Sequence, residues 1–199
     1  MVEAHQEIKE IKEYAKINNV PIMMEEGINF LTTFIIKHQI KNVLEVGTAI
    51  GYSAIMMVLS SPNVKVTSIE RDRERYLEAV KNIKRLNLED RITLIYNDAS
   101  DVELNDEFDL IFIDAAKGKN MSFFKKFSKN LNENGYIITD NINFHGYVNM
   151  DESLIKSRNL RGLVKKIKDY IVFLEENEDY TTNFYDVGDG IAVSIKNNN

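Results

Sequence analysis

Residues 43–54 read VLEVGTAIGYSA, a short apolar run that passes through a glycine-containing turn into a helical pattern. Gly47 and Gly51 allow the backbone to turn tightly and to come close to a ligand. Four more runs rich in Val and Ile follow, each ending in a turn or a helical pattern, at 64–70, 91–96, 108–114 and 135–140. This alternation predicts βαβ units, that is, an α/β fold with a mostly parallel sheet and helices on both faces.

The two ends of the chain extend this prediction. Residues 3–17 and 24–38 have helical periodicity and precede the first strand, at 42–47, and a long helical segment is expected near 152–176. In TTNFYDVGDGIAVSI, residues 181–195, the central GDG joins two runs with strand character. This predicts a C-terminal antiparallel hairpin that completes a seven-stranded sheet. We expect one domain over 1–199, with N-terminal helices in 1–38 and the core in 39–196.

Composition excludes several classes of protein. The chain has 199 residues, 44% hydrophobic and 28% charged, which is enough to bury a sizeable core. It has no cysteine, so disulfides, thiolate metal sites and a cysteine nucleophile are excluded. We expect a cytoplasmic protein, because no signal peptide or membrane-length apolar run is present. The net charge of −6 argues against indiscriminate nucleic-acid binding, although residues 117–129 are basic without one acid and permit a specific RNA contact.

The glycine turn and the acids that follow it indicate a nucleoside cofactor. Glu70 ends the next strand, where a carboxylate can accept hydrogen bonds from both hydroxyls of a ribose. No third glycine stands at dinucleotide spacing, and Glu45 is placed inside the first turn, where an acid can hold an ammonium group. S-adenosylmethionine therefore fits better than NAD. Asp98 and Ala99 follow the third strand and are placed to meet the adenine. The alternative is that these turns only pack against the protein.

A second group of polar residues ends the fourth and fifth strands. Asp114 ends one strand, and Asp140 and Asn141 end the other. Two carboxylates and an amide suit a hard divalent cation such as Mg²⁺ or Mn²⁺. Lys117 would then either take the proton of a substrate hydroxyl or stabilise the resulting oxyanion. The alternatives are an N-cap at Asp114, a strand-ending turn at residues 140–141 and a solvated surface lysine.

The motifs DAAKGKN, residues 114–120, and TDN, residues 139–141, resemble those of the cation-dependent class I O-methyltransferases, which include catechol and caffeoyl-CoA methyltransferases. The resemblance covers about residues 20–196 and implies the Rossmann-like fold of class I methyltransferases and a homodimer. It further implies metal ligands at Asp114, Asp140 and Asn141 and catalytic roles for Lys117 and Asp114. The cofactor-binding residues that it implies are Met24, Glu45, Gly47, Ser53, Glu70, Asp98, Ala99 and Asp114.

Within that group, VGTAIGYSAI, IERDRERY and TDNINFHGYV look most like the bacterial tRNA 5-hydroxyuridine methyltransferases, which form 5-methoxyuridine at the wobble position. The plant enzymes have DADK where this chain has Ala116, so an acyl-CoA phenol is a less expected substrate. A small catechol or phenol is the alternative to tRNA, because it presents the same vicinal oxygens. A further alternative is a sensor or scaffold that binds S-adenosylmethionine without turnover.

The expected RNA contacts lie in the segments 117–126 and 156–168 and in the loop after the fifth strand. Phosphates would meet basic residues of these segments, and a base would stack on an aromatic residue of the loop. The alternative is that the basic residues form only the solvated face of an amphipathic helix. The expected phosphate contacts are Arg158, Arg161, Lys165 and Lys166, and the expected stacking residues are Phe144, His145 and Tyr147.

Overall fold

The structure is a computed structural model that describes residues 2–197. Seven strands form a mixed sheet in the order β3-β2-β1-β4-β5-β7-β6. The chain divides into two compact units, Met1–Leu104 and Asn105–Asn199. The expected mostly parallel sheet with an antiparallel C-terminal hairpin is confirmed. In the described part of the chain, no helix is long and apolar enough to cross a membrane.

The N-terminal unit contains three parallel strands and four helices. Two helices precede the first strand, as predicted. The elements are α1 (Val2–Ile17), α2 (Glu25–Lys37), β1 (Asn42–Val46), α3 (Tyr52–Ser60), β2 (Lys65–Glu70), α4 (Arg73–Arg85) and β3 (Ile92–Tyr96). β1 pairs with β2, and β2 pairs with β3, so that the carboxyl ends of these strands meet at one edge.

Burial explains the order of the strands in this unit. Val43, Leu44 and Val46 of β1 are completely buried, as expected for a strand covered on both faces. β3 instead mixes buried and exposed positions, with Thr93 and Tyr96 exposed, which suits a strand at the edge of a sheet. The buried apolar residues of β1 therefore belong to the core of the unit and support the following turn.

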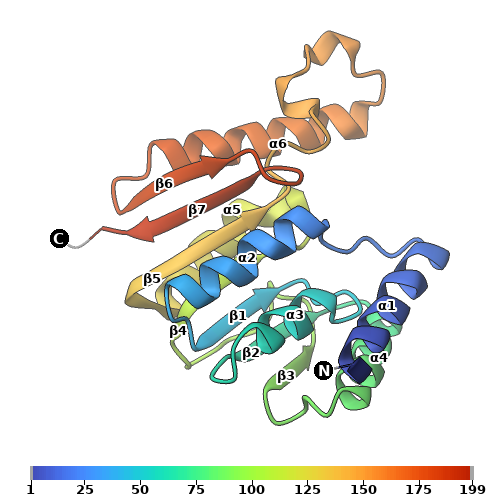
Figure 1. Cartoon of the computed structure of the whole chain (residues 1–199). Helices are drawn as coiled ribbons and strands as arrows, with labels where there is room; N and C mark the ends of the chain where they lie inside the picture. Colours follow the sequence, from blue (N-terminus) through green and yellow to red (C-terminus); the bar gives the residue numbers. More distant parts are fainter. Residues whose placement is uncertain (1, 198–199) are drawn as a thin grey trace. The chain divides into compact units, whose positions relative to one another are not determined.

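The C-terminal unit contains a parallel pair of strands and the hairpin. β4 pairs in parallel with β5, β5 pairs antiparallel with β7, and β7 pairs antiparallel with β6; Figure 1 shows β5, β7 and β6 side by side. The elements are β4 (Phe108–Ile113), η1 (Lys117–Lys119), α5 (Asn120–Phe127), η2 (Ser128–Asn130), β5 (Leu131–Asp140), η3 (Tyr147–Asn149), η4 (Glu152–Leu154), α6 (Arg158–Glu175), β6 (Tyr180–Tyr185) and β7 (Ile191–Lys196).

Aromatic side chains form much of the core of this unit. The ring of Phe124 meets those of Tyr170, Phe173 and Tyr180 edge-on, with centroids 5.0–6.3 Å apart. The Tyr170 hydroxyl is 2.7 Å from Thr139 Oγ1, so the buried phenol keeps a hydrogen-bond partner. This cluster joins α5 and α6 to β5 and β6, and Thr139 directly precedes the acid at the end of β5.

One predicted element begins later than expected. The helical segment placed near 152–176 has a 3-10 turn at Glu152–Leu154, and the α-helix starts only at Arg158. Ser157 is the N-cap, and its side chain accepts a hydrogen bond from Leu160 N at 3.3 Å. The cap therefore separates α6 from the loop before it.

Candidate active site

Backbone hydrogen bonds to β2 fix the turn between β1 and α3. Gly47 N and Thr48 N both donate to Ile69 O, at 3.0 and 3.2 Å. Gly51 is the N-cap of α3 with a φ of 85°, and a Cβ there would meet Ala79 Cβ at 3.4 Å. The left-handed backbone at position 51 therefore favours glycine, whereas a Cβ would make only an ordinary contact with α4.

Glu45 lies beneath this turn and is completely buried. The hydroxyls of Ser53 and Ser68 donate to its two carboxylate oxygens, and Thr48 Oγ1 lies 2.5 Å from Ser68 Oγ. Hydrogen bonds of this kind offset the cost of burying a carboxylate. In this structure Glu45 braces the turn, and its contact with a cofactor ammonium stays a prediction.

Glu70 is held in place at the end of β2. Ala49 N donates to Oε2 and Asp72 N donates to Oε1, each at 2.8 Å, and the residue is 8% exposed. Each carboxylate oxygen has a second lone pair beyond the one used by the backbone. The fixed carboxylate thus fits the predicted ribose site, because it can still accept from two hydroxyls.

Three further predicted cofactor residues differ in how they are held. Asp98 Oδ1 accepts from Ser100 N at 2.8 Å, and Oδ2 lies 3.3 Å from Arg71 Nη1. Ala99 is buried beside it. Met24, the N-cap of α2, is 51% exposed and free of a capping hydrogen bond from its side chain. Sequence reasoning missed Arg71 and Ser68, which hold the predicted acids.

The C-terminal unit brings the predicted metal residues together. Asp114 follows β4, and Lys117 in η1 donates from Nζ to Asp114 Oδ1 at 2.7 Å. The Lys117 side chain is only 18% exposed, so it is not the solvated surface lysine of the alternative interpretation. Asn141 directly follows β5 with a φ of 59°. Its Nδ2 lies 3.5 Å from Asp189 Oδ2, a residue that sequence reasoning did not select.

Asp140 shows the electrostatic character of this site most clearly. Its side chain is 3% exposed, and burial, together with the negative charges of Asp114 and Asp189, raises its pKa to about 7 despite the opposing charge of Lys117. A bound divalent cation would remove this repulsion between carboxylates. No group of three His, Cys, Asp or Glu side chains arranged for a metal occurs among residues 2–197. The ligand set that fits is two carboxylates with the Asn141 amide, which suits a hard cation.

The predicted RNA-binding residues on α6 are not equivalent. Arg161 Nη1 donates to Ile155 O at 2.5 Å and reaches Lys156 O at 3.5 Å, so its guanidinium fastens the loop before the helix. Arg158 and Lys165 are exposed. The stem of Lys166 lies beside Gly118, where a Cβ would meet its Cδ at 3.3 Å. Lys166 is exposed as well, so Arg158, Lys165 and Lys166 are better placed for phosphate contacts than Arg161.

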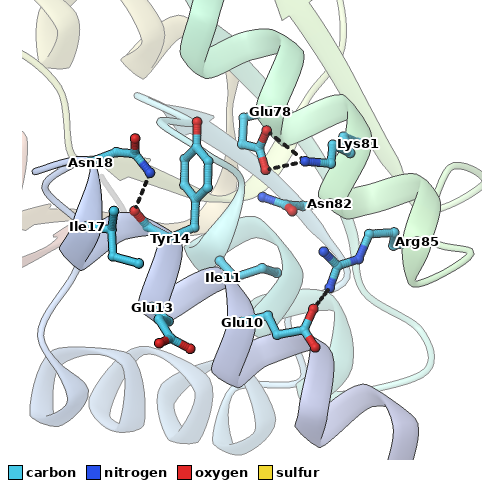
Figure 2. Close-up of a pocket in the computed structure, with 10 residues that line it drawn as sticks. All are labelled: Glu10, Ile11, Glu13, Tyr14, Ile17, Asn18, Glu78, Lys81, Asn82 and Arg85. Carbon is cyan, nitrogen blue, oxygen red and sulfur yellow. Dashed lines mark hydrogen bonds and ion pairs between the residues drawn. The ribbon is translucent and has the colours of Figure 1, made fainter.

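A separate pocket of about 300 Å³ lies between α1 and α4 in the N-terminal unit (Figure 2). It contains no predicted cofactor or metal residue. Asn82 in its wall donates from Nδ2 to Ile50 O at 2.9 Å and so supports the turn before α3. The lining residues are Glu10, Ile11, Glu13, Tyr14, Ile17, Asn18, Glu78, Lys81, Asn82 and Arg85.

The fold and the strand-end residues define a Rossmann-like methyltransferase. A family profile described as O-methyltransferase matches residues 1–197, and the chain belongs to this family. It is accordingly an S-adenosylmethionine-dependent O-methyltransferase.

The similar proteins include examples from plants and bacteria. An Arabidopsis thaliana protein, provisionally named a caffeoyl-CoA O-methyltransferase, is 30% identical over 159 residues, which are 74% of this chain and 68% of that protein. Catechol O-methyltransferase of Niastella koreensis is 34% identical over 122 residues, 58% of this chain and 55% of that one. A Staphylococcus aureus structure, provisionally named a caffeoyl-CoA O-methyltransferase, has a TM-score of 0.91 at 37% identity and covers 98% of this chain and 96% of that one.

Proposed function

We propose that this O-methyltransferase is metal-dependent and methylates the 5-hydroxyl of 5-hydroxyuridine in tRNA, forming 5-methoxyuridine. The observation that carries the metal dependence is the pair of Asp114 and Asp140, whose charges act on each other beside Asn141 and Lys117. Asp114, Asp140 and Asn141 would hold the ion. Open positions on such a cation would favour a substrate with two neighbouring oxygens, such as the 5-hydroxyl and 4-carbonyl of that base.

The proposed methyl transfer needs only the substrate hydroxyl and S-adenosylmethionine as reactants. A divalent cation held at the proposed metal site would supply Lewis-acid chemistry, which makes the hydroxyl of a substrate more acidic. Lys117 stabilises the resulting oxyanion from its position beside Asp114. The hydroxyl proton passes to solvent as the oxyanion forms. The substrate oxygen then attacks the methyl carbon, the carbon–oxygen bond forms as the carbon–sulfur bond breaks, and S-adenosylhomocysteine leaves. Glu70 holds the ribose of the cofactor throughout.

The tRNA assignment draws on the surface of the C-terminal unit. Arg158 and Lys165 are exposed on α6 and are suited to phosphates. Phe144 and Tyr147 lie in the loop after Asn141 with ring centroids 5.9 Å apart. Aromatic rings of this kind are platforms for an unstacked base. The resemblance of the motifs to the tRNA 5-hydroxyuridine methyltransferases supports the same substrate.

A small catechol is the second candidate. It presents vicinal oxygens as 5-hydroxyuridine does, and the similarity to the Niastella koreensis catechol O-methyltransferase favours it.

Nucleoside mass spectrometry of tRNA from cells with and without the gene tests the substrate. We expect loss of 5-methoxyuridine and accumulation of 5-hydroxyuridine when the gene is absent. Unchanged 5-methoxyuridine would contradict the tRNA assignment and leave the small diol as the substrate.

A further inference from the structure

The turn between β6 and β7 lies directly against the loop that follows Asn141. Ile142 N donates to Gly190 O at 3.1 Å, and Asn143 N donates to Asp189 O at 2.9 Å. These bonds continue the pairing of β5 with β7 beyond Asp140, which is opposite Ile191. A Cβ at Gly190 would lie 2.6 Å from Asn143 Cγ, so glycine is needed for this close approach.

Asp189 makes the side-chain contacts across this junction. The residue is 7% exposed. Its Oδ1 accepts from His145 N at 2.6 Å, while Oδ2 lies 3.5 Å from both Asn141 Nδ2 and His145 Nδ1. One buried carboxylate therefore contacts a proposed metal ligand and the main chain of the loop proposed to hold the substrate base.

The loop requires such a support because its backbone is strained. Asn141, Phe144 and His145 have φ values of 59°, 45° and 55°. Residues with side chains adopt this left-handed region at a cost, and they remain there only when the surroundings hold them. The short bond from His145 N to Asp189 fixes the loop within this strained stretch.

The same carboxylate determines which way the Asn141 amide faces. An asparagine binds a cation only through Oδ1, and its NH₂ group must therefore point elsewhere. Asp189 can only accept hydrogen bonds, so it attracts Asn141 Nδ2 and leaves Oδ1 for the ion. Groups outside the ligand set that orient ligands in this way commonly change metal affinity by about 10–100-fold.

We propose that Asp189 is a positioning residue, which orients Asn141 toward the metal and fixes the 141–147 loop for the substrate. This inference rests on the proposed metal dependence. It assigns a role in the reaction to the GDG turn, residues 188–190, in addition to its role as a hairpin connection.

Mn²⁺ binding to the full chain, measured by calorimetry without substrate, tests the inference. In Asp189→Asn, the new amide can use its oxygen for His145 N, and it then presents NH₂ to the NH₂ of Asn141. We expect Mn²⁺ affinity to fall about tenfold or more, with S-adenosylmethionine affinity unchanged. Asp186→Asn, in the same turn, is the matched control, because Asp186 contacts Asn143 and no proposed ligand.

The double variant Asn141→Asp/Asp189→Asn exchanges donor and acceptor between the two positions. The carboxylate at position 141 has no amide to orient, and it can accept from the new amide at position 189. We expect Asn141→Asp to restore most of the Mn²⁺ affinity lost in Asp189→Asn, because a carboxylate presents an oxygen to the ion in either orientation. If Asp189→Asn does not fold, the double variant still tests the positioning role, since we expect the double variant to fold and to bind Mn²⁺.

The outcomes separate this inference from the proposed function. If the unmodified chain binds Mn²⁺ and Asp189→Asn binds it equally well, the positioning role is wrong while metal dependence stands. Equal losses in Asp189→Asn and the double variant, or failure of the double variant to bind, also overturn the positioning role. If the unmodified chain binds neither Mn²⁺ nor Mg²⁺, the metal dependence and the positioning role are both overturned.

Discussion

Lys117 Nζ lies 2.7 Å from Asp114 Oδ1, and both side chains are mostly buried after β4. The ammonium group therefore occupies one oxygen of a proposed metal ligand. A cation held by Asp114 would compete for that oxygen, which would free Lys117 to contact the substrate. Because Lys117 shares Asp114 with the proposed cation, replacing Lys117 should affect turnover and metal binding differently.

Lys117→Met is expected to lower kcat by about 10²–10⁴-fold, because the oxyanion loses its stabilising charge. Metal affinity is expected to stay equal or to rise, since the competitor for Asp114 has been removed. Single-turnover kinetics and Mn²⁺ titration measure the two effects. Unchanged kcat would remove Lys117 from the mechanism, and a parallel loss of metal binding would make its role structural.

Asp140→Ala is expected to abolish turnover while the affinity for S-adenosylmethionine stays within about threefold. The substitution removes one proposed metal ligand, and truncation of a ligand weakens the site strongly. Calorimetry with the cofactor and, separately, with Mn²⁺ distinguishes the two sites. Full activity in this variant would show that the carboxylate at the end of β5 holds no essential ion.

Glu70→Ala is expected to weaken S-adenosylmethionine binding by about 1–3 kcal/mol, because two ribose hydroxyls lose a charged acceptor. Ala49 N and Asp72 N also lose their acceptor, so part of the change reflects the turn itself. Glu70→Gln keeps one acceptor oxygen and should show an intermediate dissociation constant. Identical affinity in all three proteins would contradict the placement of the ribose.

The raised pKa of Asp140, about 7, gives the metal-free protein a definite pH dependence. Between the ordinary carboxyl pKa and this value, the folded state binds a proton that the unfolded state has released. The free energy of unfolding therefore falls as pH rises from about 4 to about 7, by a few kcal/mol at most. Saturating Mg²⁺ should reduce this slope, because the cation takes the place of the proton.

Urea unfolding between about pH 5 and about pH 8, in EDTA and in excess Mg²⁺, measures this dependence. Asp140→Asn is the control, because it removes the titrating group and should flatten the slope in EDTA. Equal slopes in the unmodified protein and in this variant would assign the pH dependence to other groups.

Reversing the charges of Arg158 and Lys165 to Glu is expected to raise the Michaelis constant for tRNA and to reduce its salt dependence by about one unit of slope per lost phosphate contact. A small catechol should be unaffected. Arg161 is unsuitable for this test, because it fastens Ile155 and Lys156. The matched control is charge reversal at the exposed Lys16 and Lys84. Equal effects of both pairs would exclude a specific tRNA surface on α6.

The sequence predicted those features that depend on neighbouring residues. The β1–α3 turn, the acids at the strand ends and the C-terminal hairpin follow from local patterns of apolar residues and glycine. The predicted start of the last helix, near residue 152, was wrong, because α6 begins at Arg158. The N-cap signal at Ser157 is nevertheless present in the sequence.

Individual side-chain contacts between segments far apart in the sequence could not be predicted. The contact of Asp189 with Asn141 spans 48 residues, and the hydrogen bond of Ser68 to Glu45 spans 23. Nothing local in DVGDG distinguishes a turn that only connects two strands from one that supports a metal ligand. The burial of Glu45 likewise depends on the complete packing around β1.

Methyl transfer from labelled S-adenosylmethionine to purified tRNA containing 5-hydroxyuridine tests the central claim most directly. The account predicts labelled 5-methoxyuridine with Mg²⁺, none in excess EDTA, and full recovery when Mg²⁺ is restored. Undiminished transfer in EDTA, or no transfer to this tRNA while a catechol is methylated with Mg²⁺, would contradict it.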